Sequence, residues 1–113
     1  YGFDEIMLSA LALGATGAVG SSFNFAAPIY LSLMKAFAAG DLKTAREEQF
    51  RSVQTIALLA SRGYMGAAKA TMKMLGVDVG PARLPNGSLN AEQQASLRTE
   101  LENLGFFDWV KRG

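Results

Sequence analysis

Apolar residues recur at spacings of three and four along most of this 113-residue chain, and glycine stands where each run stops. A period close to 3.6 residues is typical of helices that bury one face. Glycine just after a run is typical of a helix end. The pattern therefore predicts five helices, over residues 4–13, 26–39, 42–61, 65–75 and 90–104.

The longest predicted helix, over residues 42–61, has a sequence that indicates which side faces the core. Gly40-Asp41 precedes it and is expected to cap it. Glu47 and Arg51 are spaced i,i+4 and are expected to pair on the solvent side. One apolar stripe is expected to be buried, and it consists of Phe50, Val53, Ala57 and Ala60.

The last predicted helix carries signals at both of its ends. Asn90 followed by Gln93 is typical of a capping box, in which each side chain bonds the other residue's backbone N–H. Leu97, Leu101 and Leu104 are expected on its inner face, and Gly105 is expected to end it before an aromatic tail.

One segment between the first two helices breaks the helical pattern. Residues Gly17–Ser21 are short, small and rich in glycine, which suits a buried parallel strand. A lone strand has no ladder partner for its N–H and C=O groups. Either the segment is not a strand and the chain is a helical bundle, or the rest of the sheet lies outside this chain. The order helix, strand, helix favours a piece of an alternating α/β fold.

Composition excludes several kinds of chemistry. Eleven Lys and Arg nearly cancel ten Asp and Glu, so the net charge of +1 does not favour a nucleic-acid partner. Cys and His are both absent, which excludes thiol and imidazole catalysis and metal sites built on these residues. The sequence shows no apolar run long enough to span a membrane and no signal peptide, so we expect a cytoplasmic protein without a membrane partner.

Four motifs together carry a resemblance to a known family. Gly2-Phe3-Asp4-Glu5 matches a G-x-D-E motif, and Gly20-Ser21-Ser22-Phe23-Asn24 stands where the family has G-S-T-Y-N. The turn Gly40-Asp41 and the segment Gly80–Pro85, which reads G-P-x-R-x-P, match as well. On these residues the whole chain resembles the C-terminal half of the N-acetylneuraminate lyases (sialic acid aldolases). These enzymes belong to the dihydrodipicolinate synthase superfamily of pyruvate-dependent class I aldolases.

The resemblance implies an α/β fold, the (β/α)8 TIM barrel, followed by three C-terminal extension helices. Gly2 would end the seventh strand, residues 17–21 would be the eighth strand, and residues 26–39 the eighth helix. Residues 1–40 would then be the last βα units of the barrel, and residues 41–113 the helical extension. Such a barrel takes about 250 residues, so the chain resembles the tail of the enzyme.

The resemblance also implies a substrate-binding set, which consists of Gly2, Asp4, Glu5, Gly20 and Ser21. Ionised carboxylates only accept hydrogen bonds and therefore suit the hydroxyls of a sugar. From the pattern alone, Asp4 and Glu5 are better explained as an N-cap and a complement to the helix dipole. Ser21 alone is equally well explained as a loop or capping residue. Phe23 lacks the phenol hydroxyl of the motif, and Tyr64 and Met65 are expected to be packing residues.

The implied reaction is the reversible cleavage of N-acetylneuraminate to N-acetylmannosamine and pyruvate. A lysine on the sixth strand would form a Schiff base with the keto group, which acts as an electron sink for the breaking bond. Its helpers, a tyrosine and a Ser/Thr pair, also precede Tyr1. A lysine of this kind needs burial or a neighbouring cation, and no lysine of this chain lies on the predicted strand. These lysines are Lys35, Lys43, Lys69, Lys73 and Lys111.

The chain itself is therefore expected to hold no catalytic residue, cofactor or metal, and to be inactive alone. Its expected partners are the sugar acid, pyruvate, the upstream half of the same barrel and further copies in a homotetramer. Two alternatives remain open: another pyruvate-dependent aldolase such as dihydrodipicolinate synthase, and a non-catalytic helical interaction module. The segment Gly17–Ser21 discriminates between barrel and bundle, since only a barrel would extend and pair it.

Overall fold

The computed structural model describes residues 1–111, and within them every regular element is a helix. The last two residues of the predicted extension, 112 and 113, lie outside the described residues. None of the described helices combines the length and apolar character needed to cross a membrane. The elements are a short 3-10 helix η1 (Asp4–Ile6), α1 (Met7–Ala12), α2 (Phe23–Ala38), α3 (Leu42–Ser61), α4 (Tyr64–Met74), α5 (Ala91–Leu104) and α6 (Phe106–Val110).

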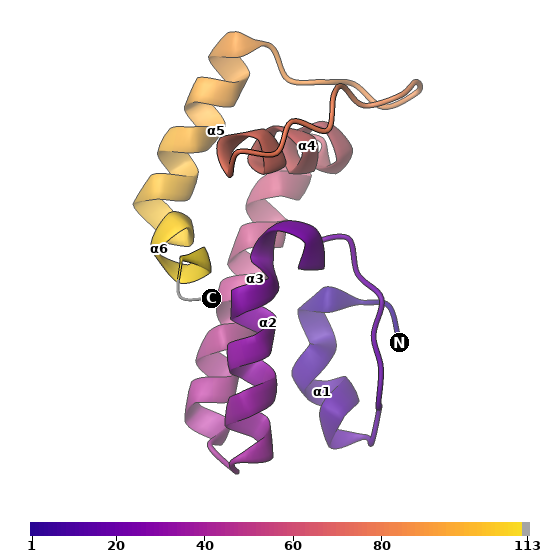
Figure 1. Cartoon of the computed structure of the whole chain (residues 1–113), viewed down its shortest axis with the longest axis vertical. Coiled ribbons are helices and arrows are strands. Elements are labelled where there is room, and N and C mark those ends of the chain that lie inside the picture. The colour runs from indigo at the N-terminus through magenta and orange to yellow at the C-terminus, as the bar shows by residue number, and fades with distance from the viewer. Residues whose placement is uncertain (112–113) are drawn as a thin grey trace.

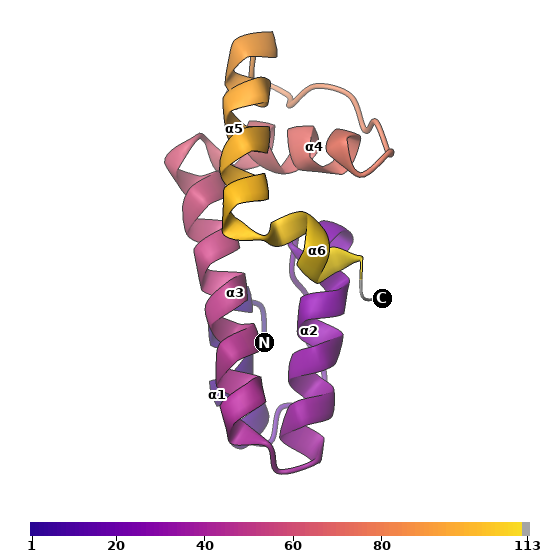
Figure 2. The ribbon, with the colours of Figure 1, turned by 90° about the vertical axis from the view of Figure 1, so that its left-hand side faces the viewer.

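An antiparallel pair of long helices, α2 and α3, forms the axis of the molecule (Figure 1). Helix α1 packs against both of them, and α4 crosses the end of α3. Helix α5 runs back along the outside, and α6 returns the chain to α2 (Figure 2). The side chains at the centre of these contacts are fully buried, and the largest are Phe106, Ile29, Leu33, Leu59, Leu97 and Leu101.

The helix ends follow local capping signals. Asp41 accepts a hydrogen bond from the backbone N–H of Thr44 at 3.0 Å and begins α3 as predicted. Asn90 and Gln93 form both bonds of the capping box at the start of α5. Gly105 ends α5 in the left-handed region, with φ of 98°. These three predicted helix ends are confirmed. They could be predicted because residues close by in the sequence determine them.

The prediction for the buried face of α3 is wrong. Phe50 is 60% exposed, and Ala57 and Ala60 are exposed as well. The face that meets α2 and the other helices is instead small and partly polar, and it consists of Ala45, Glu48, Ser52, Thr55 and Leu59. Small residues and hydroxyls are accepted there because each hydroxyl has a hydrogen-bond partner, and Thr55 donates to the Arg51 carbonyl at 2.8 Å.

The ion pair predicted on α3 is also wrong, because Arg51 pairs with a different glutamate. Arg51 binds Glu48 at 2.8 Å, spaced i,i+3, and not Glu47. The reason is that Arg51 lies at the edge of the buried face, with its guanidinium over the ring of Trp109 at 5.1 Å. This stacking turns Arg51 toward the buried Glu48, which is 2% exposed.

The predicted strand Gly17–Ser21 does not form as a regular element, because residues 15–20 are irregular and Ser21 lies in a turn. The segment nevertheless pairs with the start of the chain. The N-terminal amine of Tyr1 donates to the Gly17 carbonyl at 3.3 Å, and the Val19 N–H donates to the Tyr1 carbonyl at 3.0 Å. One residue bonded to two residues spaced i,i+2 is the pattern of adjacent parallel strands. A single paired residue is too short for a strand.

Two further helix boundaries differ from the prediction. Asp4 is not the N-cap of the first helix, since Phe3 occupies that position and makes no side-chain cap hydrogen bond. Helix α2 begins at Phe23, three residues before the predicted start, with a kink at Ala26 (φ −126°, ψ 20°). The kink lies two residues before Pro28, whose ring cannot follow an unbroken helical turn.

Candidate functional site

The two sequence motifs meet at one cavity of about 460 Å³. All five predicted binding residues line it, although they come from segments 15 residues apart in the chain. Helix α3 contributes Ile56 and Ala60 to the wall, and α4 contributes Tyr64. The cavity therefore lies where η1, the end of the irregular segment and two later helices come together. The five predicted residues are Gly2, Asp4, Glu5, Gly20 and Ser21.

Asp4 lies at the back of this cavity and is 6% exposed. One of its carboxylate oxygens, Oδ2, accepts from the Ser22 backbone N–H at 3.2 Å and from the Ser22 hydroxyl. Ser22 is the N-cap residue of α2, so Asp4 ties η1 to the start of that helix. Asp4 thus acts on a helix terminus, but on a different helix from the one the sequence suggested.

Gly20 is required by the position of Asp4. A Cβ atom at residue 20 would lie 1.9 Å from Asp4 Oδ1 and 2.5 Å from its carboxyl carbon. Any side chain at this position would therefore have to displace the carboxylate. The absence of a side chain lets the backbone before Ser21 lie directly against Asp4.

Glu5 and Ser21 are the more accessible members of the set. Glu5 is half-buried, and within residues 1–111 no hydrogen bond or ion pair occupies its carboxylate. Ser21 is exposed, and its hydroxyl lies 2.7 Å from the Tyr64 hydroxyl. The cavity thus combines a carboxylate acceptor with two hydroxyl groups that can donate or accept.

Tyr64, which the sequence analysis assigned to packing, does pack against the hydrophobic core, and it also lines the candidate cavity. It is the first residue of α4, and Gly63 before it has a φ of 80° that reverses the chain toward the cavity. Burial, and then the nearby charges of Asp4 and Glu5, raise the pKa of Tyr64 against the opposing effect of its Ser21 hydrogen bond. The phenol therefore keeps its proton at neutral pH. The packing prediction for Met65 is wrong, since its side chain is exposed, and it also lies outside the cavity wall.

A buried chain of hydroxyl groups continues from Asp4 into the core. The Ser22 hydroxyl lies 2.5 Å from the Tyr30 hydroxyl, which in turn lies 2.7 Å from the Ser52 hydroxyl. Burial raises the pKa of Tyr30 to about 12, so it remains a neutral phenol. The chain joins η1, α2 and α3 through polar contacts.

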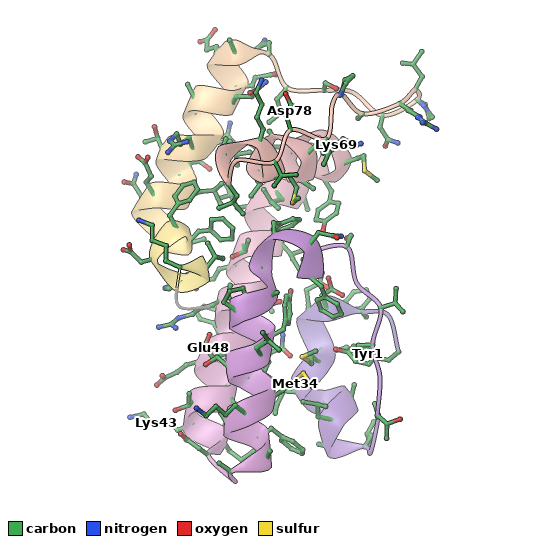
Figure 3. The ribbon with its side chains drawn as sticks, in the orientation of Figure 1. Tyr1, Met34, Lys43, Glu48, Lys69 and Asp78 are labelled. Atoms are coloured by element: carbon green, nitrogen blue, oxygen red, sulfur yellow. The ribbon has the colours of Figure 1, made fainter. Side chains whose placement is uncertain are left out.

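The lysines of the described chain are exposed or half-buried and lie away from the candidate cavity. Lys43 lies at the far end of the α2–α3 pair, away from the cavity (Figure 3). Lys35, Lys73 and Lys111 are exposed, and Lys69 is only half-buried. None of the five lines the candidate cavity. Residues 1–111 also contain no cluster of three metal-ligating side chains.

The fold and the site together define the class of protein. The structure is similar to that of the Proteus mirabilis N-acetylneuraminate lyase, with a TM-score of 0.86, 37% identity, and coverage of 93% of this chain and 36% of that one. Such structural neighbours are TIM-barrel aldolases, and this chain corresponds to the C-terminal part of one. The predicted fold class is confirmed at this level, and the absence of a complete sheet within residues 1–111 agrees with it.

The sequence comparisons define the family. The model of the dihydrodipicolinate synthetase family matches residues 1–104, and the chain belongs to this family. It is 38% identical over 106 residues to the N-acetylneuraminate lyase of Gallus gallus, with coverage of 92% of this chain and 34% of that protein. It is 37% identical over 111 residues to that of Rattus norvegicus, with coverage of 96% and 35%. The chain spans about a third of the length of these relatives.

Proposed function

We propose that this chain supplies the sugar-binding side of the active site in a Schiff-base aldolase that cleaves N-acetylneuraminate to N-acetylmannosamine and pyruvate. The observation that carries the proposal is the convergence of all five motif residues on one cavity. The names of the most similar relatives support N-acetylneuraminate as the substrate. The alternative of a non-catalytic helical interaction module loses support, because solved structures that resemble this chain are barrel enzymes.

The residues of the cavity divide into two roles in this proposal. Glu5 accepts hydrogen bonds from the sugar hydroxyls, because its carboxylate is unoccupied within the described chain and reaches the cavity. Ser21 and Tyr64 bind the next hydroxyl along, and the exposed backbone of Gly2 binds another. Asp4 and Gly20 shape the wall of the cavity. Asp4 Oδ2 binds Ser22, and Asp4 Oδ1 lies next to Gly20.

The bond-breaking chemistry belongs to residues upstream of Tyr1. A lysine there would form the imine with the keto carbon, and the imine would take up the electron pair of the broken bond. The pairing of Tyr1 with Gly17 and Val19 supports an upstream partner, because residues before Tyr1 would extend it into a parallel ladder. No cofactor is needed in this reaction.

An apolar cavity of about 310 Å³ supports the same upstream partner. It lies beside the paired segment, and both Tyr1 and Met34, labelled in Figure 3, line it. We propose that the upstream half of the barrel covers this cavity. The division into barrel units (1–40) and extension (41–113), a homotetramer and a cytoplasmic location belong to the same proposal.

Replacing Glu5 tests the sugar-binding role. Glu5→Gln in the intact protein that carries this chain keeps the shape of the side chain and removes its charge. Loss of a charge-assisted hydrogen bond is expected to raise the KM for N-acetylneuraminate about tenfold. Trapping of pyruvate by borohydride should be unchanged, because Glu5 takes no part in imine formation. Steady-state kinetics and a trapping assay measure the two effects.

The matched control is Glu47→Gln, which removes the same charge from an exposed position of α3 outside the cavity. It should leave the KM within twofold of the wild type, roughly the effect of an ordinary surface substitution. An unchanged KM in Glu5→Gln, or an equal rise in both variants, would remove Glu5 from the site.

A further inference from the structure

The hydroxyl chain that starts at Asp4 has a fixed direction. An ionised carboxylate only accepts hydrogen bonds, so the Ser22 hydroxyl donates its single proton to Asp4. Ser22 must then accept from Tyr30, and Tyr30 must accept from Ser52. Every hydroxyl in the chain therefore has one possible orientation, and its direction is set by the carboxylate at its end.

This polar chain lies in the centre of the helical packing. Ser22 is 0% exposed, Ser52 is 1% exposed and Tyr30 is 3% exposed. Burying hydroxyl groups lowers stability unless each finds a partner, and all buried side-chain N and O atoms of the described residues have one. Replacement of such groups by apolar residues is often neutral for stability. Removal of a single hydroxyl, in contrast, leaves its partner unpaired inside the packing.

The first two members of the chain, Asp4 and Ser22, adjoin the candidate site. Asp4 directly precedes Glu5, and Ser22 directly follows Ser21. A second contact from α3 supports the first segment, since the Gln49 amide donates to the Asp4 carbonyl at 3.2 Å and accepts from the Leu8 N–H at 2.8 Å. Helix α3 thus holds η1 through Gln49 and the start of α2 through Ser52.

From this geometry we propose that Ser52 and Tyr30 are positioning residues for sugar binding. They hold Ser22 against Asp4, and so fix the separation of Glu5 and Ser21 across the cavity. Ser52 itself does not line the cavity, and it acts only through Tyr30 and Ser22. This inference rests on the proposed function for its effect on catalysis, but its effect on the backbone is independent of any substrate.

Two variants of the intact protein test the proposal by kinetics. Ser52→Ala and Tyr30→Phe each remove one hydroxyl from the chain. Each is expected to raise the KM for N-acetylneuraminate roughly three- to tenfold, the effect of one hydrogen bond, with kcat reduced less than twofold. The KM of the double variant should exceed that of Tyr30→Phe by no more than about twofold, because both substitutions act through the same hydroxyl chain. Borohydride trapping with pyruvate should be unchanged in all three.

The matched control is Thr55→Val on the same helix. Thr55 is 1% exposed, and among residues 1–111 its hydroxyl bonds only the carbonyl of Arg51, so it is equally buried but outside the hydroxyl chain. Its KM should stay within about twofold of the wild type, since it loses a local bond and no site contact. A rise in KM as large as that of Ser52→Ala, or no rise in either test variant, would overturn the proposal.

Hydrogen exchange keeps the test independent of the substrate. In Ser52→Ala and Tyr30→Phe, amide exchange over residues 2–8 and 20–25 should be roughly tenfold faster, and Thr55→Val should leave it unchanged. Faster exchange without measurable lyase activity in the wild type would contradict the proposed function and support the positioning role. Unchanged exchange in both test variants would contradict the positioning role even in an active enzyme.

Discussion

Gly20→Ala is expected to destabilise the protein by about 1–3 kcal/mol and to raise the KM for N-acetylneuraminate tenfold or more. The added Cβ would lie 1.9 Å from Asp4 Oδ1, which is far inside van der Waals contact. Asp4 cannot simply rotate away, because two bonds from Ser22 hold its other oxygen. Either the carboxylate or the backbone beside Ser21 must move, and both belong to the candidate site. Chemical denaturation and steady-state kinetics measure the two effects.

Two controls separate a local clash from a general effect of alanine. Gly17→Ala adds the same atom in the same segment, where nothing lies within 4 Å of the new Cβ. It should change the free energy of unfolding by less than about 0.5 kcal/mol. In an Asp4→Ala background, Gly20→Ala should lose most of its cost, because the atoms that clash are gone. Equal costs with and without the Asp4 carboxylate would contradict this explanation.

Phe106→Ala is expected to have the largest effect on stability, about 3–5 kcal/mol. Phe106 begins α6, is 0% exposed, and meets Phe107 edge to face with ring centroids 5.3 Å apart. Helix α6 packs on α2, so this ring joins the C-terminal helices to the α2–α3 pair (Figure 2). Its removal leaves a cavity that the surrounding helices can fill only in part. Urea denaturation of the variant measures the loss.

Phe50→Ala is the control of the same chemistry. Its ring is 60% exposed on α3, so truncation should cost less than about 0.5 kcal/mol. A cost for Phe106→Ala as small as that of Phe50→Ala would contradict the packing of α6 on the core.

The sequence predicted the ends of several helices because their signals are local. Asp41, the Asn90–Gln93 pair and Gly105 act on backbone groups within four residues of themselves. The buried face of α3 was not predictable in this way. Phe50 is exposed and Ser52 is buried because the hydroxyl of Tyr30, 22 residues away, lies opposite Ser52. The spacing of apolar residues in one helix does not show which polar groups the neighbouring helix presents to it.

The candidate site shows the same division between local and distant information. Its five residues were found from two motifs, and the structure brings them to one cavity. The contact of Tyr64 with Ser21 could not be predicted from the sequence, because the two residues are 43 positions apart. The tie from Asp4 to Ser22 spans 18 residues, and nothing in the first helix alone indicates it. The predicted strand failed because Tyr1 supplies only one paired residue.

The central claim is that this chain binds the sugar while upstream residues form the imine. The most direct measurement is mass spectrometry with peptide mapping after treatment with pyruvate and borohydride, on the intact protein and on residues 1–113 alone. We expect one reduced pyruvate adduct per intact subunit, on a lysine that precedes Tyr1, and none on the isolated chain. An adduct on Lys35, Lys43, Lys69, Lys73 or Lys111 would contradict the claim, and so would an intact protein that takes up no pyruvate.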